Sequence, residues 1–199
     1  MSFDGRDRRL VRLFTACVLG RWSDVRAERA SAASGEPDRR WREAVLQVHV
    51  FAGFPRLVEA YEVLAEAGGL GAADADEFHD SGEAGARGRV LFERIYADKA
   101  DAVRRRLEHH NTDYARWILE HAYGRVLARP GLTADRRELL AVAALAALGQ
   151  DRQLASHARG AVRCGATAED VHATLDAIAD FVDVERFERA RTVVQTFAR

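Results

Sequence analysis

The sequence contains few of the residues that break helices or cross-link chains. Its 199 residues include three prolines and two cysteines. The cysteines, Cys17 and Cys164, are far apart and show no paired spacing, which argues against a disulfide framework and against zinc held by cysteines. Long stretches repeat apolar residues with helical periodicity, and no alternating strand pattern bounded by turn residues is present. The sequence therefore predicts an all-α fold.

Long hydrophobic runs and an excess of either charge are also missing. The longest apolar run, 139–149, has eleven residues, well short of the ~18 that a membrane span needs. The first nine residues, MSFDGRDRR, do not resemble a secretory signal. Thirty basic side chains stand against thirty-one acidic ones, so the overall charge does not attract nucleic acid. We expect a soluble cytoplasmic protein with neither nucleic acid nor a membrane as a partner.

A helical hairpin is predicted at residues 133–165. The apolar run ends at Gly149, and glycine often follows a helix because it adopts the left-handed conformation. A polar pair, Gln150 and Asp151, comes next, and a second helical stretch follows it. The first helix is rich in alanine, whose small side chains let two helix axes approach closely.

The spacing around this turn brings one acid and one histidine to the same height. Glu138 lies roughly 16 Å before Gly149, and His157 lies roughly 12 Å after it, at 1.5 Å per helical residue. A carboxylate and an imidazole are therefore expected to meet in the seam between the helices. Gln150 and Gln153 precede His157 at the spacing of one helix face, so these three side chains form one polar stripe.

The hairpin resembles the carboxymuconolactone decarboxylase family, which shares the AhpD-like fold with the alkylhydroperoxidases. The matching positions are Arg137, Glu138, Leu139, Gly149, Gln153, Leu154, His157, Gly165, Thr167 and Val171. In the peroxidase branch of the family, a Cys-x-x-Cys pair stands where this chain has Gln150 and Gln153. The resemblance implies an all-α, AhpD-like helical fold, with Glu138 and His157 as the catalytic pair.

The remaining chain reads as further helices. They are predicted at 7–19, 22–34 ending at Gly35, 37–51 starting at Pro37, 55–67, 89–95, 98–109, 112–128, from Thr167, and at 183–198. Within 112–128 we expect six side chains to face a core: Tyr114, Trp117, Ile118, Ala122, Val126 and Leu127. Residues 68–88, rich in glycine, alanine and aspartate, are predicted as a linker.

The chain also resembles itself, because residues 8–64 align with 137–194. We therefore predict a degenerate first repeat at 1–67, a linker and helical insert at 68–111, and a second repeat at 112–199. Only the second repeat keeps the acid and the histidine, since Arg9 and Glu28 replace them in the first. Residues 48–55 of the first repeat resemble the family instead, and we expect His49 and Phe54 there to complete the substrate pocket.

The resemblance also implies a chemistry. Loss of a carboxylate from a small lactone or keto acid leaves an enolate, which His157 could protonate while Glu138 orients it. Gln150 and Gln153 would donate hydrogen bonds to substrate oxygens. We expect no cofactor. We also expect no metal ion, because no His-x-x-x-His or similar ligand pair stands on one helix face.

Two alternatives stay open. The first is an alkylhydroperoxidase-like antioxidant activity, which needs a reactive thiol and a second thiol close by. The second is a non-catalytic helical oligomer that binds a small acid, in which Glu138 and His157 only satisfy each other. Family members with one repeat assemble into hexameric rings, so a chain with two repeats is expected to form a homotrimer that imitates the hexamer.

Overall fold

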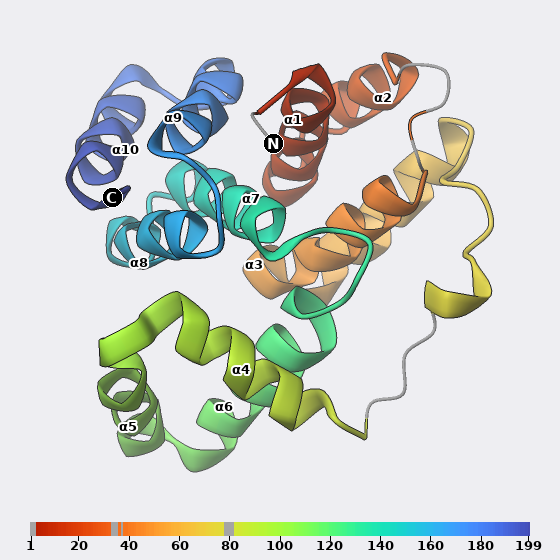
Figure 1. Ribbon diagram of the computed structural model, residues 1–199. Coiled ribbons are helices and arrows are strands. Elements are labelled where there is room, and N and C mark those ends of the chain that lie inside the picture. The colour runs from red at the N-terminus through yellow and green to blue at the C-terminus, as the bar shows by residue number, and fades with distance from the viewer. Residues whose placement is uncertain (1–2, 33–35, 37, 78–81) are drawn as a thin grey trace.

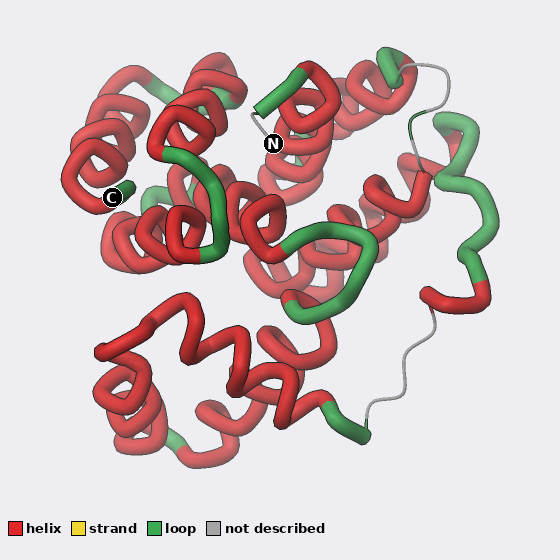
Figure 2. Tube along the Cα trace, viewed as in Figure 1, coloured by secondary structure: helices red, strands yellow, loops and turns green. Residues whose placement is uncertain are grey.

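The computed structural model describes residues 3–32, 36, 38–77 and 82–199. In these ranges the chain forms helices joined by loops, and no strand is present (Figure 2). The all-α fold class is therefore confirmed. None of the described helices is long and apolar enough to cross a membrane. The predicted helix boundaries at Gly35 and Pro37 lie outside the described residues.

Three helices form the first part of the chain: α1 (Gly5–Leu19), α2 (Trp22–Ala30) and α3 (Asp38–Glu66). Asp4 caps α1 through a capping box with Asp7, and Gly20 ends it in the left-handed conformation, with φ 72°. Helix α2 ends four residues earlier than predicted. Helix α3 spans both of the helices predicted at 37–51 and 55–67, with a break at Gly53, where φ is 80°.

The middle of the chain is more helical than predicted. It contains the short helix η1 (Ala75–Glu77), α4 (Ala84–Tyr96), η2 (Ala97–Lys99), α5 (Ala100–His110) and α6 (Thr112–Trp117). Helix α4 starts within the predicted linker 68–88, so that prediction is wrong after residue 83. The predicted helix 112–128 changes after Trp117 into a π-helix, η3 (Ile118–Leu127).

Two glycines let α4 and η3 pack backbone to backbone. A Cβ atom on Gly88 would overlap the carbonyl oxygen of Leu119, and one on Gly124 would overlap that of Ala84. Any side chain at either position would force the two helices apart. Helices α4, α5, α6 and η3 therefore form a separate layer, which lies below α7 and α8 in Figure 1.

The last part of the chain contains α7 (Ala134–Ala147), α8 (Asp151–Arg163), α9 (Ala168–Ala177), η4 (Ala179–Phe181) and α10 (Val184–Phe197). Gly149 is left-handed, with φ 68°, as the predicted hairpin requires. Thr167 caps α9 through a capping box with Asp170. A left-handed glycine also follows α1, but the internal repeat stays a prediction.

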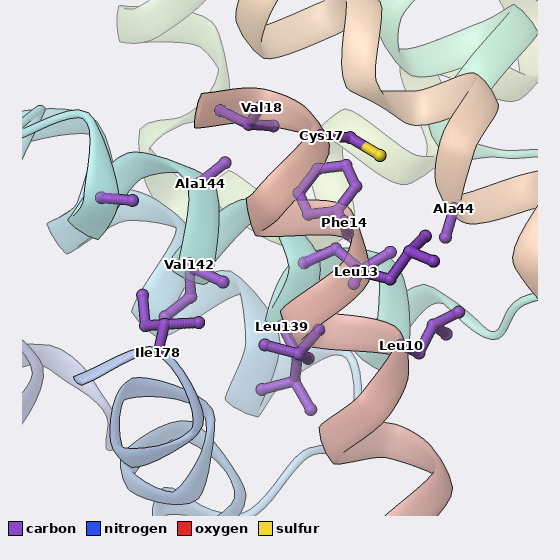
Figure 3. Close-up of a cluster of buried hydrophobic side chains, with 14 of the residues drawn as sticks. Leu10, Leu13, Phe14, Cys17, Val18, Ala44, Leu139, Val142, Ala144 and Ile178 are labelled. Atoms are coloured by element: carbon purple, nitrogen blue, oxygen red, sulfur yellow. The ribbon is translucent and has the colours of Figure 1, made fainter. Parts of the chain in front are cut away.

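Two apolar cores hold these parts together. The larger one joins α1, α3 and α7 to α8, α9 and α10, and Figure 3 shows Leu13 of α1 near Leu139 of α7. The smaller core lies between α4, α5 and η3, and Cys164 at the end of α8 contributes to it. Of the side chains predicted to face a core within 112–128, Val126 and Leu127 are buried. The prediction is wrong for Tyr114 and Trp117, because their exposed fractions are 46% and 62%.

Candidate functional site

Glu138 and His157 form a buried hydrogen-bonded pair. Helix α7 carries the acid and α8 the histidine, and the left-handed turn at Gly149 folds one helix onto the other. A Glu138 Oε2 atom lies 2.9 Å from His157 Nδ1. The exposed fractions are 1% for Glu138 and 8% for His157. The structure thus brings Glu138 and His157 into contact, as the spacing around the turn at Gly149 predicts.

The acid controls the charge and the orientation of the imidazole. Burial alone would lower the pKa of His157, but the charge and the hydrogen bond of Glu138 outweigh burial, so the pKa lies above the ordinary value of 6.5. Because Nδ1 faces the carboxylate, Nδ1 carries a proton in both states of the ring. The other nitrogen, Nε2, makes no hydrogen bond with the described residues. It is also not one of the buried polar atoms that lack a partner, so it is accessible. Nε2 is therefore the atom that can exchange a proton with a ligand.

A glycine makes room for the carboxylate. A Cβ atom on Gly160, which follows His157 by less than one turn on α8, would lie 2.5 Å from Glu138 Oε2 and 2.8 Å from Cγ2 of Ile95. Ile95 belongs to α4, so the inserted layer closes the seam from outside. Phe51 of α3 closes the other side, with its ring centroid 6.4 Å from that of His157. The pair therefore lies where all three parts of the chain meet.

Two tyrosines near the pair were missed by the sequence analysis. The hydroxyl groups of Tyr96, at the end of α4, and Tyr123, in the π-helix, are 3.1 Å apart. Burial raises the pKa of both phenols, and the negative charge of Glu138 adds to this rise. Both groups are therefore neutral at physiological pH. Their positions depend on packing between α4 and η3, for which no motif in the sequence gives a signal.

The four predicted substrate-binding residues fall into two groups, one at the start of α8 and one on α3. Gln150 and Gln153 have exposed side chains, which form no hydrogen bond within the described part of the chain. His49 and Phe54 lie together on either side of the break in α3, with rings stacked 4.9 Å apart. The structure adds His121 of η3 to them, because its Nε2 atom lies 2.8 Å from His49 Nε2.

A buried ionic network fixes the start of α7 against α3. Arg137 and Glu43 are each 1% exposed and approach to 2.6 Å. Arg129 binds the same carboxylate through two nitrogens, and Gln47 exchanges hydrogen bonds with Arg137. Burial alone would raise the pKa of Glu43, but the two arginines hold it below its ordinary value. Arg137 precedes Glu138, so this network fixes the backbone that carries the acid.

Among the described residues, neither the cysteines nor the side chains that could bind a metal ion form a second site. Burial raises the pKa of Cys17 and of Cys164 to about 12, and Glu138 adds to the effect at Cys164. Both thiols therefore stay protonated. No group of three or more histidine, cysteine or acidic side chains is placed to hold a metal ion among the described residues.

Residues 112–196 match the carboxymuconolactone decarboxylase family model. The chain is 30% identical over 135 residues to peroxisomal protein 2 of Schizosaccharomyces pombe, covering 65% of this chain and 62% of that protein. It is 36% identical over 61 residues to 4-carboxymuconolactone decarboxylase of Acinetobacter baylyi, covering 31% of this chain and 46% of that enzyme. The chain thus spans less than two thirds of either relative.

Proposed function

We propose that residues 112–196, which form a carboxymuconolactone decarboxylase family domain, carry out acid/base chemistry on a small lactone or keto acid. The observation that carries this proposal is the buried pair of Glu138 and His157, whose hydrogen bond leaves the Nε2 atom of His157 open. A structural pair needs no open nitrogen, whereas a proton donor does. The similarity to 4-carboxymuconolactone decarboxylase supports the same class of substrate.

The proposed reaction is a decarboxylation. The bond between the carboxylate carbon and the adjacent carbon breaks, carbon dioxide leaves, and the electron pair stays on the substrate as an enolate. Protonated His157 then delivers its Nε2 proton to carbon and becomes neutral. Glu138 favours the protonated ring before this step, because its charge raises the pKa of His157. This reaction needs no oxidant or reductant.

The predicted substrate-binding residues, Gln150, Gln153, His49 and Phe54, would contact the substrate. The exposed amides of Gln150 and Gln153 are free to donate hydrogen bonds to substrate oxygens. His49 and Phe54 are placed on the α3 side, where Phe51 reaches the ring of His157. We propose that a substrate lying over Nε2 would contact both groups.

The alternative peroxidase activity is less favoured. A thiol peroxidase needs a thiolate, and lowering the pKa of a cysteine is the usual way to obtain one. Here the environment of Cys164 does the opposite. The non-catalytic alternative differs in one respect, since it predicts binding of a small acid without turnover.

Activity measurements on matched variants test the proposal. Carbon dioxide release from carboxymuconolactone and from a panel of small keto acids is measured with the wild type, His157→Gln and Glu138→Gln. We expect His157→Gln to lower kcat by at least about a hundredfold, the usual contribution of a general acid. His172→Gln, the same substitution on α9, serves as the control and should keep full activity, because the His172 side chain makes no hydrogen bond or ring contact with the described residues. Equal turnover by His157→Gln and the wild type would refute the proposal.

A further inference from the structure

A small cavity opens between the end of α4 and the outer face of α8. Its volume is about 170 Å³, and its lining residues are Ile95, Tyr96, Asp98, Lys99, Ser156, Arg159 and Arg163. This volume equals the share of about six water molecules in the liquid, so a small organic acid fits. Neither Glu138 nor His157 lines the cavity. Ile95 and Tyr96, which also lie near that pair, do line it, so the cavity borders the proposed proton-transfer site.

The charged side chains around this cavity leave an excess of positive charge. Lys99, Arg159 and Arg163 stand against the single carboxylate of Asp98. Asp98 pairs with Lys99 at 2.8 Å, and it lies 3.9 Å from Arg163, which is the limit of an ion pair. Arg159 has no carboxylate partner among the described residues and instead lies over the ring of Phe197. Arg163 also donates a hydrogen bond from Nη1 to the carbonyl oxygen of Ile95, at 2.8 Å. The cavity thus has one guanidinium group without a carboxylate partner, Arg159, and a second, Arg163, whose carboxylate partner lies 3.9 Å away.

The uncharged polar groups of the cavity can also donate hydrogen bonds. The hydroxyl groups of Tyr96 and Tyr123 share one hydrogen bond, which uses only one of their two protons. One phenolic proton therefore remains available. The hydroxyl of Ser156 makes no hydrogen bond within the described part of the chain. Apart from Asp98 at the rim, the polar side chains of this cavity can all donate hydrogen bonds.

We propose that this cavity binds a small organic acid through its carboxylate, with Arg159 and Arg163 as the charged partners and Tyr96 as a neutral donor. A planar guanidinium matches a carboxylate with two parallel hydrogen bonds, which an ammonium group cannot do. The apolar side chain of Ile95 lies beside these donors and suits a short carbon chain. The proposal does not depend on the proposed decarboxylation.

Titration calorimetry with succinate and its neutral analogue succinamide tests this site. We expect the wild type to bind succinate and to bind succinamide at least about tenfold more weakly, because the analogue lacks the charge. Arg159→Gln and Arg163→Gln should each weaken succinate binding about tenfold. Tyr96→Phe, which keeps the ring, should weaken it about threefold or more. Arg163 is partly exposed, so its variant carries the test even if Arg159→Gln does not fold.

Arg152→Gln is the matched control, because it removes the same charge from an exposed position on α8 that does not line the cavity. Its succinate affinity should stay within about twofold of the wild type. Three results would each overturn the proposal: no heat of binding with succinate, equal binding of succinate and succinamide, or the same loss of affinity in Arg152→Gln as in Arg159→Gln. Because only binding is measured, failure of the proposed enzyme activity would leave these outcomes unchanged.

Discussion

Replacing Gly160 by alanine should separate Glu138 from His157 without changing either residue. The added methyl group would lie 2.5 Å from Glu138 Oε2 and 2.8 Å from Ile95 Cγ2, and both distances are shorter than a van der Waals contact. Ile95 belongs to the smaller apolar core and is 1% exposed. The carboxylate is the group with more freedom to move, so we expect it to shift away from the imidazole.

The expected change in the free energy of unfolding follows from two opposing effects. Overpacking of a tight interior costs about 1–3 kcal/mol, whereas alanine inside a helix is about 0.5–1 kcal/mol more favourable than glycine. Because both contacts are shorter than 3 Å, the overpacking cost lies in the upper part of its range, about 2–3 kcal/mol. The net loss should therefore be about 1–2 kcal/mol in the free energy of unfolding. For a chain of this size, this corresponds to a decrease in Tm of about 2–8 °C. The pKa of His157 should also fall, because burial remains while the influence of the carboxylate weakens.

Thermal unfolding and NMR titration of the histidine rings measure these two effects. Gly85→Ala is the control, because a methyl group there would lie 3.5 Å from Cγ of Glu120, an ordinary contact. Gly85 lies in α4 without a positive φ, so this change should leave the stability equal or slightly increased. If Gly160→Ala is as stable as the wild type and its His157 titrates at the same pH, the carboxylate is not held where the structure places it.

Three further predictions concern the buried network, the pH dependence and the assembly. Glu43→Ala leaves Arg137 buried without its acid, so urea unfolding should show a loss of about 3–5 kcal/mol in the free energy of unfolding. Glu185→Ala, on the exposed face of α10, should change this free energy little. Equal losses in the two variants would contradict the role of burial. Because the pKa of His157 is raised, its stabilisation is complete below about pH 6.5 and is lost as pH rises through the folded-state value. The stability advantage of the wild type over His157→Gln should therefore shrink above pH 6.5, and a growing advantage would disprove the sign. Finally, light scattering should give three times the 22.1 kDa of one chain, and a monomer would rule out the trimer.

The helical hairpin was predictable because its signals are local. Gly149 marks the turn, and a fixed rise per residue then places Glu138 opposite His157. Thr167 likewise marks the start of α9 by its own side chain. Such features depend on residues within a few turns of one another, so the sequence alone was enough to predict them.

The inserted layer was less predictable because its structure depends on contacts between distant segments. The π-helix has no sequence signal of its own, yet it brings Tyr123 to Tyr96 and His121 to His49. Trp117 belongs to an apolar pattern typical of a core, but its side chain is exposed, and the helix changes its winding at the next residue. Glu43 could not be connected with Arg137 either, since 94 residues separate them.

The most direct test of the proposed site is the pH titration of the His157 ring by NMR, with His157→Ala to assign the signal and small lactone and keto acids as ligands. We predict a ring that titrates above pH 6.5 and whose signal shifts when one of these acids binds. In Glu138→Gln the same ring should titrate at lower pH. A His157 ring that does not titrate and that no acid affects would contradict the account and leave a buried pair with a structural role alone.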